Sequence, residues 1–164
     1  MEQQQQQHIF VDMALRGWQS HIQRATKAFD SFTDEDLYRE VRPGANRVIY
    51  LMGHLVAIHD SMNTLLGLGD RHFAAWDEPF IRQPDKSGQT VPSPAEIRQA
   101  WTKTNDVLSA HFAALTPEAW LGRHTAVSEE DFGKEPYRNK LNVLLGRTQH
   151  LAYHLGQIVL AKKP

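Results

Sequence analysis

The stretch Arg147-Thr-Gln-His150-Leu-Ala-Tyr-His154-Leu-Gly-Gln157-Ile158 decides the fold of this chain. Its leucines recur at helical spacing, which predicts an amphipathic helix with one face in a core. His150 and His154 lie one turn apart at the edge of that face. Two imidazoles at this spacing are near enough to share a metal ion, although an ordinary polar helix face is the commoner explanation of such a pair on its own.

The same periodicity returns in three earlier segments, so the sequence predicts an all-α, antiparallel four-helix bundle. The predicted long helices cover residues 9–32, 46–66, 93–115 and 138–162. Ser93 is the expected cap of the third helix, because Pro94 follows it and Glu96 completes a capping box. Thr116 predicts a short helix by the same logic. Residues 122–136 are expected to form a polar connection.

Domain organisation follows from the length of the chain. We expect one domain over residues 1–164, with a Gln-rich terminus, residues 1–7, that frays or feeds into the first helix. The stretch from Gly69 to Pro92 is the longest irregular segment and contains Trp76 and Phe80. Such loops are often functional, so it is either a lid or a surface connection pinned by its aromatic residues.

Composition excludes several classes of protein. The chain has 164 residues, of which 41% are hydrophobic and 23% are charged, with no Cys and a net charge of -1. No apolar run approaches the roughly 20 residues of a membrane span. Disulfides and Cys-ligated metals are impossible, so a transition metal must use His or carboxylates. The near-neutral charge argues against nucleic acid, and the N-terminus resembles no secretory signal, so we expect a cytoplasmic protein.

A third metal ligand has to come from another helix, because catalytic zinc sites usually have three protein ligands and an open position. His54 is the candidate. It lies at the edge of the apolar stripe of the second predicted helix, and Gly53 gives space beside it.

The segments Leu51-Met-Gly-His54-Leu and His150-Leu-Ala-Tyr-His154-Leu-Gly-Gln157-Ile158 together resemble the DinB-like superfamily of bacterial four-helix metalloproteins. The resemblance spans essentially the whole chain in helix order, and its most specific part is the H-x-x-x-H-x-G-Q-I ending. It implies that His54, His150 and His154 bind one divalent metal. Three imidazoles without a thiolate suit Zn, Ni, Fe or Cu, and the sequence does not choose among them.

Further polar residues lie near the three histidines in the sequence pattern. Tyr50 and Gln157 are candidates for hydrogen bonds to the ligands or for substrate contacts, or they are ordinary surface residues. Arg47 and Arg147 are candidates for holding an anionic substrate, unless they are solvated or paired with a carboxylate.

The remaining histidines are weaker candidates. His59 is turned about 140° from His54 and cannot chelate the same ion from a regular helix. His21 and His111 are better explained as hydrogen-bonded core residues. His8, His72 and His124 are expected in terminal or loop positions.

Three hypotheses for function remain. The first is an enzyme whose metal activates a low-molecular-weight thiol or water for transfer or hydrolysis on a small molecule, the two reactions that the resemblance implies. We lean slightly to thiol transfer. The second is a non-catalytic metal-binding or small-ligand-binding bundle, either monomeric or dimeric through an exposed helix face. The third is a structural bundle whose histidines only pack.

Overall fold

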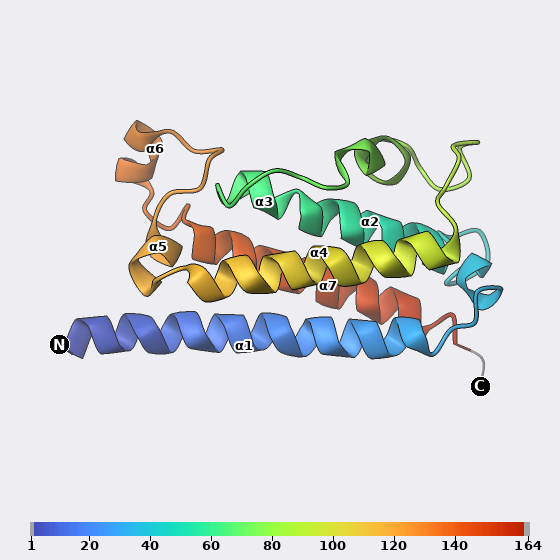
Figure 1. The fold of residues 1–164 in the computed structure, drawn as a ribbon, viewed down its shortest axis with the longest axis horizontal. Helices are drawn as coiled ribbons and strands as arrows, with labels where there is room; N and C mark the ends of the chain where they lie inside the picture. Colours follow the sequence, from blue (N-terminus) through green and yellow to red (C-terminus); the bar gives the residue numbers. More distant parts are fainter. Residues whose placement is uncertain (1, 163–164) are drawn as a thin grey trace.

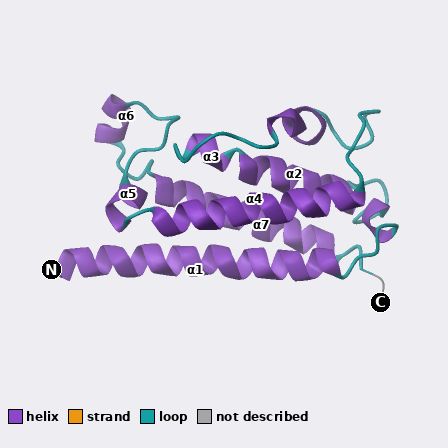
Figure 2. Ribbon diagram, in the orientation of Figure 1, coloured by secondary structure: helices purple, strands orange, loops and turns teal. Residues whose placement is uncertain are grey.

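The structure is a computed structural model that describes residues 2–162, and the regular elements in this range are all helical. The long helices are α1 (Glu2–Asp30), α2 (Val48–Asp60), α4 (Pro94–Ala114) and α7 (Lys140–Val159) (Figure 1). The short helices are α3 (Met62–Leu65), α5 (Pro117–Leu121) and α6 (Glu129–Lys134), with single turns η1 (Asp36–Tyr38), η2 (Ala74–Trp76) and the π-helical η3 (Glu78–Arg82). The prediction of an all-helical chain is confirmed (Figure 2).

The long helices do not simply alternate in direction. Helices α2 and α4 pack side by side and run the same way, as do α1 and α7 (Figure 1). Hydrogen bonds from α2 and the following α3 to α4 show this parallel order, because His59 of α2 pairs with Asn105 and the later Asn63 of α3 pairs with the later His111. The antiparallel order predicted from the sequence is therefore not observed for these two pairs.

The long connections explain the difference. Residues 66–93 return along the length of the molecule before α4 begins, so α4 runs the same way as α2, whereas residues 115–139, with α5 and α6, stay at the end where α4 finishes and α7 begins (Figure 1). Helices α1 and α4 are antiparallel, since the Trp101 indole donates to Thr26 while the earlier Arg98 donates to the later Phe29 carbonyl. Hydrophobic periodicity carries no information on helix direction, so only the connections could have indicated it.

The Gln-rich N-terminus is helical. Residues 2–7 form the first turns of α1, so of the two expected alternatives they feed into the first helix rather than fray, and residue 1 lies outside the described residues. Their side chains are mostly exposed. Gln is a good helix former and Glu2 suits the positive end of the helix dipole, which accounts for a helix here without core contacts.

Local capping sets several helix ends. Ser93 forms the predicted capping box with Glu96 at the start of α4. Asn139 caps α7, and Ser128 caps α6, a short helix within the segment that was predicted as a polar connection. The second predicted helix is interrupted at Ser61, which separates α2 from α3.

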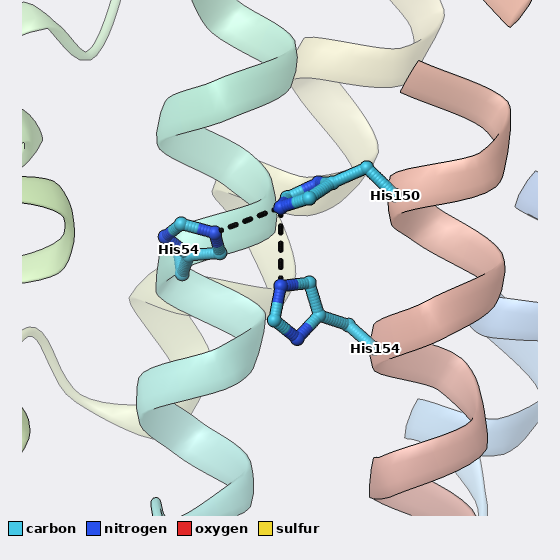
Figure 3. Close-up of side chains that lie close together, drawn as sticks. All are labelled: His54, His150 and His154. Carbon is cyan, nitrogen blue, oxygen red and sulfur yellow. Dashed lines mark hydrogen bonds between the residues drawn. The ribbon is translucent and has the colours of Figure 1, made fainter. Parts of the chain in front are cut away.

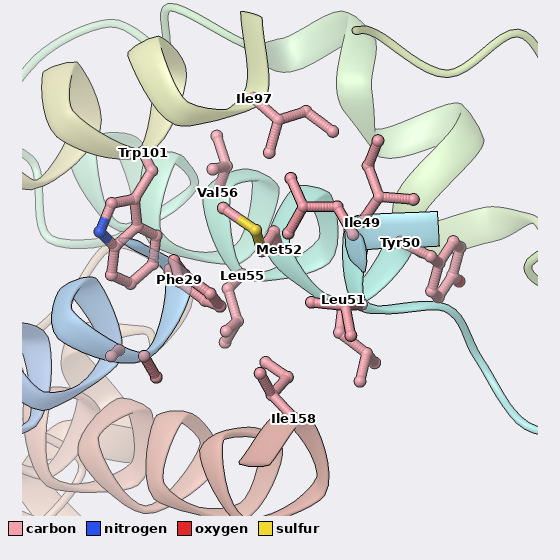
Figure 4. Packing of buried hydrophobic residues seen from close by; sticks show 14 of the residues in the cluster. Phe29, Ile49, Tyr50, Leu51, Met52, Leu55, Val56, Ile97, Trp101 and Ile158 are labelled. Carbon is pink, nitrogen blue, oxygen red and sulfur yellow. The ribbon is translucent and has the colours of Figure 1, made fainter. Parts of the chain in front are cut away.

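Helix α2 lies in the centre of the larger apolar core. Met52 and Leu55 are fully buried among side chains from α1, α4 and α7, including Phe29, Trp101 and Ile158 (Figure 4). All residues of α2 are buried except two, His54 and Ile58, which are partly exposed. Burial by the neighbouring helices therefore leaves His54 as the one ionisable side chain of α2 with access to solvent.

The long connection before α4 packs against α2. Phe80 of η3 is fully buried, the Tyr50 hydroxyl donates to the Gln83 carbonyl at 2.8 Å, and Arg47 forms an ion pair with Asp85 at 2.6 Å. These contacts fit the pinned surface connection rather than the lid. Among residues 2–162, no helix combines the length and apolarity that crossing a membrane requires.

Candidate metal centre

Three imidazoles from two helices meet at one point. His54 extends from α2, and His150 and His154 extend from α7, with their rings directed toward one another (Figure 3). The Nε2 atom of His150 lies 3.2 Å from Nε2 of His54 and 3.1 Å from Nε2 of His154. The structure thus brings together the three histidines that the sequence pattern singled out.

The outer ring nitrogens fix the orientation of two of these rings. Nδ1 of His54 lies 2.8 Å from the Phe80 carbonyl oxygen, and Nδ1 of His154 lies 2.7 Å from Oε1 of Gln157. A carbonyl oxygen only accepts, so Nδ1 carries the proton in both rings. In their neutral forms His54 and His154 therefore direct Nε2 lone pairs toward His150.

Burial keeps all three rings neutral. Desolvation is the largest cause of a lowered pKa at His54, His150 and His154. The neighbouring histidines lower the pKa of His150 further, while the bond to Gln157 partly opposes the effect at His154. Neutral imidazole is the form that binds metals, so the site needs no deprotonation at pH 7.

The arrangement fits a metal ion. A tetrahedral ion bound to imidazole nitrogens at 2.0–2.1 Å sets those nitrogens about 3.4 Å apart, close to the two observed spacings. Without a cation the site contains a conflict, because His150 Nε2–H can donate to only one of the two lone pairs that face it. All three candidate ligand atoms lie within 4.8 Å of one another. Among residues 2–162, no fourth His, Cys, Asp or Glu joins this group, and the three side chains are partly exposed, so a fourth position is accessible.

The residues proposed around the three histidines separate into two groups. Gln157 contacts His154, as described above, and Arg147 has no carboxylate partner among the described residues. Tyr50 and Arg47 instead bind the long connection through Gln83 and Asp85. For Arg47 the structure agrees with the alternative reading, a carboxylate partner, rather than with a role in holding substrate.

The other histidines lie outside the centre. His59 is completely buried, contacts the ring of Trp18 and pairs with Asn105, and His111 pairs with Asn63. His21 bonds to the Gly17 carbonyl in its own helix. His8 differs from expectation because it lies within α1.

Sequence reasoning missed one functional contact, the Phe80 carbonyl that accepts from His54. A backbone acceptor leaves no residue-type signal in a sequence. The available hint was Gly53, a glycine in the middle of an apolar helix, because it marks a close approach. A Cβ at Gly53 would come closer than 3.0 Å to three carbons of the Phe80 ring.

These features define a class of protein: an all-helical domain with a three-histidine centre between its second and last long helices. The DinB superfamily model matches residues 18–158, and the chain belongs to that superfamily. No curated protein matches the chain.

Proposed function

We propose that this protein is a metal-dependent enzyme in which His54, His150 and His154 hold one divalent transition ion, zinc, nickel or iron. The observation that carries the proposal is the convergence of the three Nε2 atoms. In two of the three rings, His54 and His154, the other nitrogen, Nδ1, is already hydrogen-bonded. Membership of the DinB superfamily supports it. We further propose that the four long helices form the four-helix bundle that the resemblance implies, as one domain.

The residues of the chain would prepare the site for a nucleophile. A bound ion supplies Lewis acidity, which lowers the pKa of a thiol or water at its open position. The Phe80 carbonyl and the Gln157 amide hold His54 and His154 in the orientation that presents their lone pairs. The packed helices on either side exclude water from the inner face of the centre, while the outer face stays accessible to a small substrate.

The nucleophile is proposed to be a low-molecular-weight thiol, with water as the second candidate. The resemblance to the family implies both reactions, transfer to an electrophile and hydrolysis. The alternative is a non-catalytic bundle that binds a metal or a small ligand. We propose no nucleic acid or membrane partner, and a cytoplasmic location.

A homodimer also belongs to the proposal. Large apolar side chains are exposed on α1 and α7, and a second copy of the chain would cover them on association. They include Phe10 and Met13 on α1, and Leu145 and Tyr153 on α7.

Metal analysis of protein purified without a His tag tests the ligand assignment. We expect about one equivalent of metal in the wild type and none in the His54→Ala/His154→Ala double variant. His72→Ala is the matched control, since His72 is exposed and outside the centre. Full metal occupancy in the double variant would overturn the assignment, and the histidines would then be packing residues.

Turnover assays separate an enzyme from a binding protein. Metal-loaded wild type is assayed with several thiols against a chloro or epoxide electrophile, and without thiol against ester and amide substrates. We expect turnover in one of these two sets. If the rates in both sets are no higher than those of the metal-free double variant, the protein is a binding protein and not an enzyme for these substrates.

A further inference from the structure

Arg147 lies on the same face of α7 as the metal centre. It precedes His150 by three residues and His154 by seven, so the three side chains extend from consecutive turns along one stripe. The Arg147 side chain is partly buried, and its Nε atom is fully buried with no hydrogen-bond partner. Burial lowers the pKa of Arg147, which shows that its charge is held in an unfavourable environment.

The other partly buried arginines of comparable burial have acidic partners. Arg47 is paired with Asp85 at 2.6 Å and Arg71 with Asp60 at 3.0 Å. Within residues 2–162, the side chain of Arg147 forms no ion pair and no hydrogen bond. A partly desolvated charge without a partner is costly, so its presence calls for an external partner.

The electrostatics of the centre add to this requirement. Arg147 lies one helix turn before His150 on α7, so its charge lies beside the three imidazoles. Within residues 2–162, no Asp or Glu belongs to the group that the three histidines form. Three neutral imidazoles, a divalent ion and Arg147 together give a strongly positive site that attracts anions.

We propose that Arg147 is an anion-binding residue of this centre and that the molecule bound there carries a carboxylate or phosphate. Because Arg147 precedes His150 by one helix turn, that group would lie beside the atom that occupies the open metal position. This inference rests on the proposed function, because the second contact of the bound molecule is with the metal ion. A short thiol with a carboxylate two or three bonds beyond the sulfur-bearing carbon has the required reach.

Three thiols of similar size test the proposal by binding alone. Wild-type protein loaded with Co²⁺ is titrated with 3-mercaptopropionate (anionic), 2-mercaptoethanol (neutral) and cysteamine (cationic), and the thiolate-to-cobalt absorption band reports binding. The same titrations are run on Arg147→Gln. Comparing the ratio of affinities between the two proteins cancels the intrinsic differences among the thiols.

We expect the preference for 3-mercaptopropionate over 2-mercaptoethanol to fall about tenfold in Arg147→Gln, the effect of losing a hydrogen bond to a charged group. Lys140→Gln removes the same charge from the first residue of α7 and should leave the preference unchanged. An unchanged preference in Arg147→Gln, or an equal loss in Lys140→Gln, would overturn the proposal.

The metal-free protein separates this inference from the proposed function. Sulfate is titrated into it, and NMR follows the side-chain Nε–H signal of Arg147 and the amide signal of Leu151. We expect saturable shifts in the wild type, with the Leu151 shift lost in Arg147→Gln. Sulfate binding in a protein that takes up no metal would refute the proposed function and keep the anion site, whereas metal uptake without any sulfate-dependent shift would refute the anion site alone.

Discussion

The Phe80 ring occupies the space that a side chain at position 53 would need. Gly53 lies in the middle of α2, and a Cβ there would come closer than 3.0 Å to Cδ1, Cε1 and Cζ of Phe80. The ring is fully buried, and the carbonyl of the same residue accepts the hydrogen bond from His54. One glycine therefore lets the connection pack onto α2 and supplies the acceptor that orients a proposed metal ligand.

Replacing Gly53 should consequently affect both stability and metal binding. We expect Gly53→Ala to lower the free energy of unfolding by about 1–3 kcal/mol, because the rigid ring has to move out of a packed position. Metal affinity should fall as well, since the Phe80 carbonyl moves with its ring. Denaturant unfolding and a metal titration measure the two effects.

Gly156→Ala is the matched control for this change. Gly156 lies in α7, and a Cβ there would meet no atom within 4 Å. Ala is the better helix former, so this variant should be unchanged or up to about 1 kcal/mol more stable. A Gly53→Ala variant as stable as Gly156→Ala would show that the Phe80 contact contributes nothing.

The ion pair between Arg47 and Asp85 should fasten the long connection to the start of α2. The Asp85 side chain is 1% exposed and accepts from both the guanidinium and the backbone N–H of Arg47. Although burial alone would raise the pKa of Asp85, the bonds from Arg47 hold it below its usual value. We expect Asp85→Asn to lower the free energy of unfolding by about 2–3 kcal/mol, below the full loss for a completely buried pair because Arg47 is partly exposed.

Denaturant unfolding at pH 7 measures the Asp85 variant. Asp12→Asn serves as the control, since it removes an exposed ion pair with Arg16 on α1 and should cause no measurable change. Equal stability of the two variants would mean that the connection is held by its apolar contacts, above all by Phe80.

His59 should make the fold sensitive to mild acid. It is completely buried, and desolvation lowers its pKa from 6.5 to about 3. Below pH 6.5 the unfolded chain binds a proton at this residue that the folded protein cannot bind, so stability falls as the pH falls toward 3. Between pH 7 and pH 5 the loss due to His59 is about 2 kcal/mol.

The His59→Gln variant tests this pH dependence with metal removed by a chelator. Gln keeps a donor for Asn105 and does not titrate, so the decrease in unfolding free energy from pH 7 to pH 5 should be about 2 kcal/mol smaller than in the wild type. His72→Gln, at an exposed position, should behave as the wild type. The same slope in all three proteins would show that His59 is protonated in the folded state.

The sequence predicted the helices and the three histidines for a common physical reason. Periodicity assigns each residue to a helix face, and the faces of His54, His150 and His154 border apolar stripes that had to meet in a core. Periodicity gives no helix direction, so the parallel pairs α1 with α7 and α2 with α4 could not be foreseen. Within one helix, positions were predictable, whereas the arrangement of the helices depended on connections without a pattern.

The contacts that the connection before α4 makes could not be predicted from hydrophobic periodicity either. Arg47 and Arg147 were both predicted to be near the three histidines, yet only Arg47 has an acidic partner among the described residues. That partner, Asp85, lies in an irregular segment whose path no hydrophobic pattern encodes. The Phe80 carbonyl escaped prediction for the same reason.

Gln157 provides the last prediction, because its amide oxygen is the acceptor for Nδ1 of His154 at 2.7 Å. An acceptor at this place fixes the tautomer and makes Nε2 a stronger ligand, and removing such partners usually lowers metal affinity about 10–100-fold. We expect that loss in Gln157→Ala, measured by competition with a chelator, and tighter binding in Gln157→Glu, whose carboxylate is a stronger acceptor. Gln149→Ala, at an exposed position of α7, should bind as the wild type does. If Gln157→Ala also kept wild-type affinity, helix packing alone would orient His154, and the hydrogen bond from Nδ1 would be a consequence of that orientation rather than its cause.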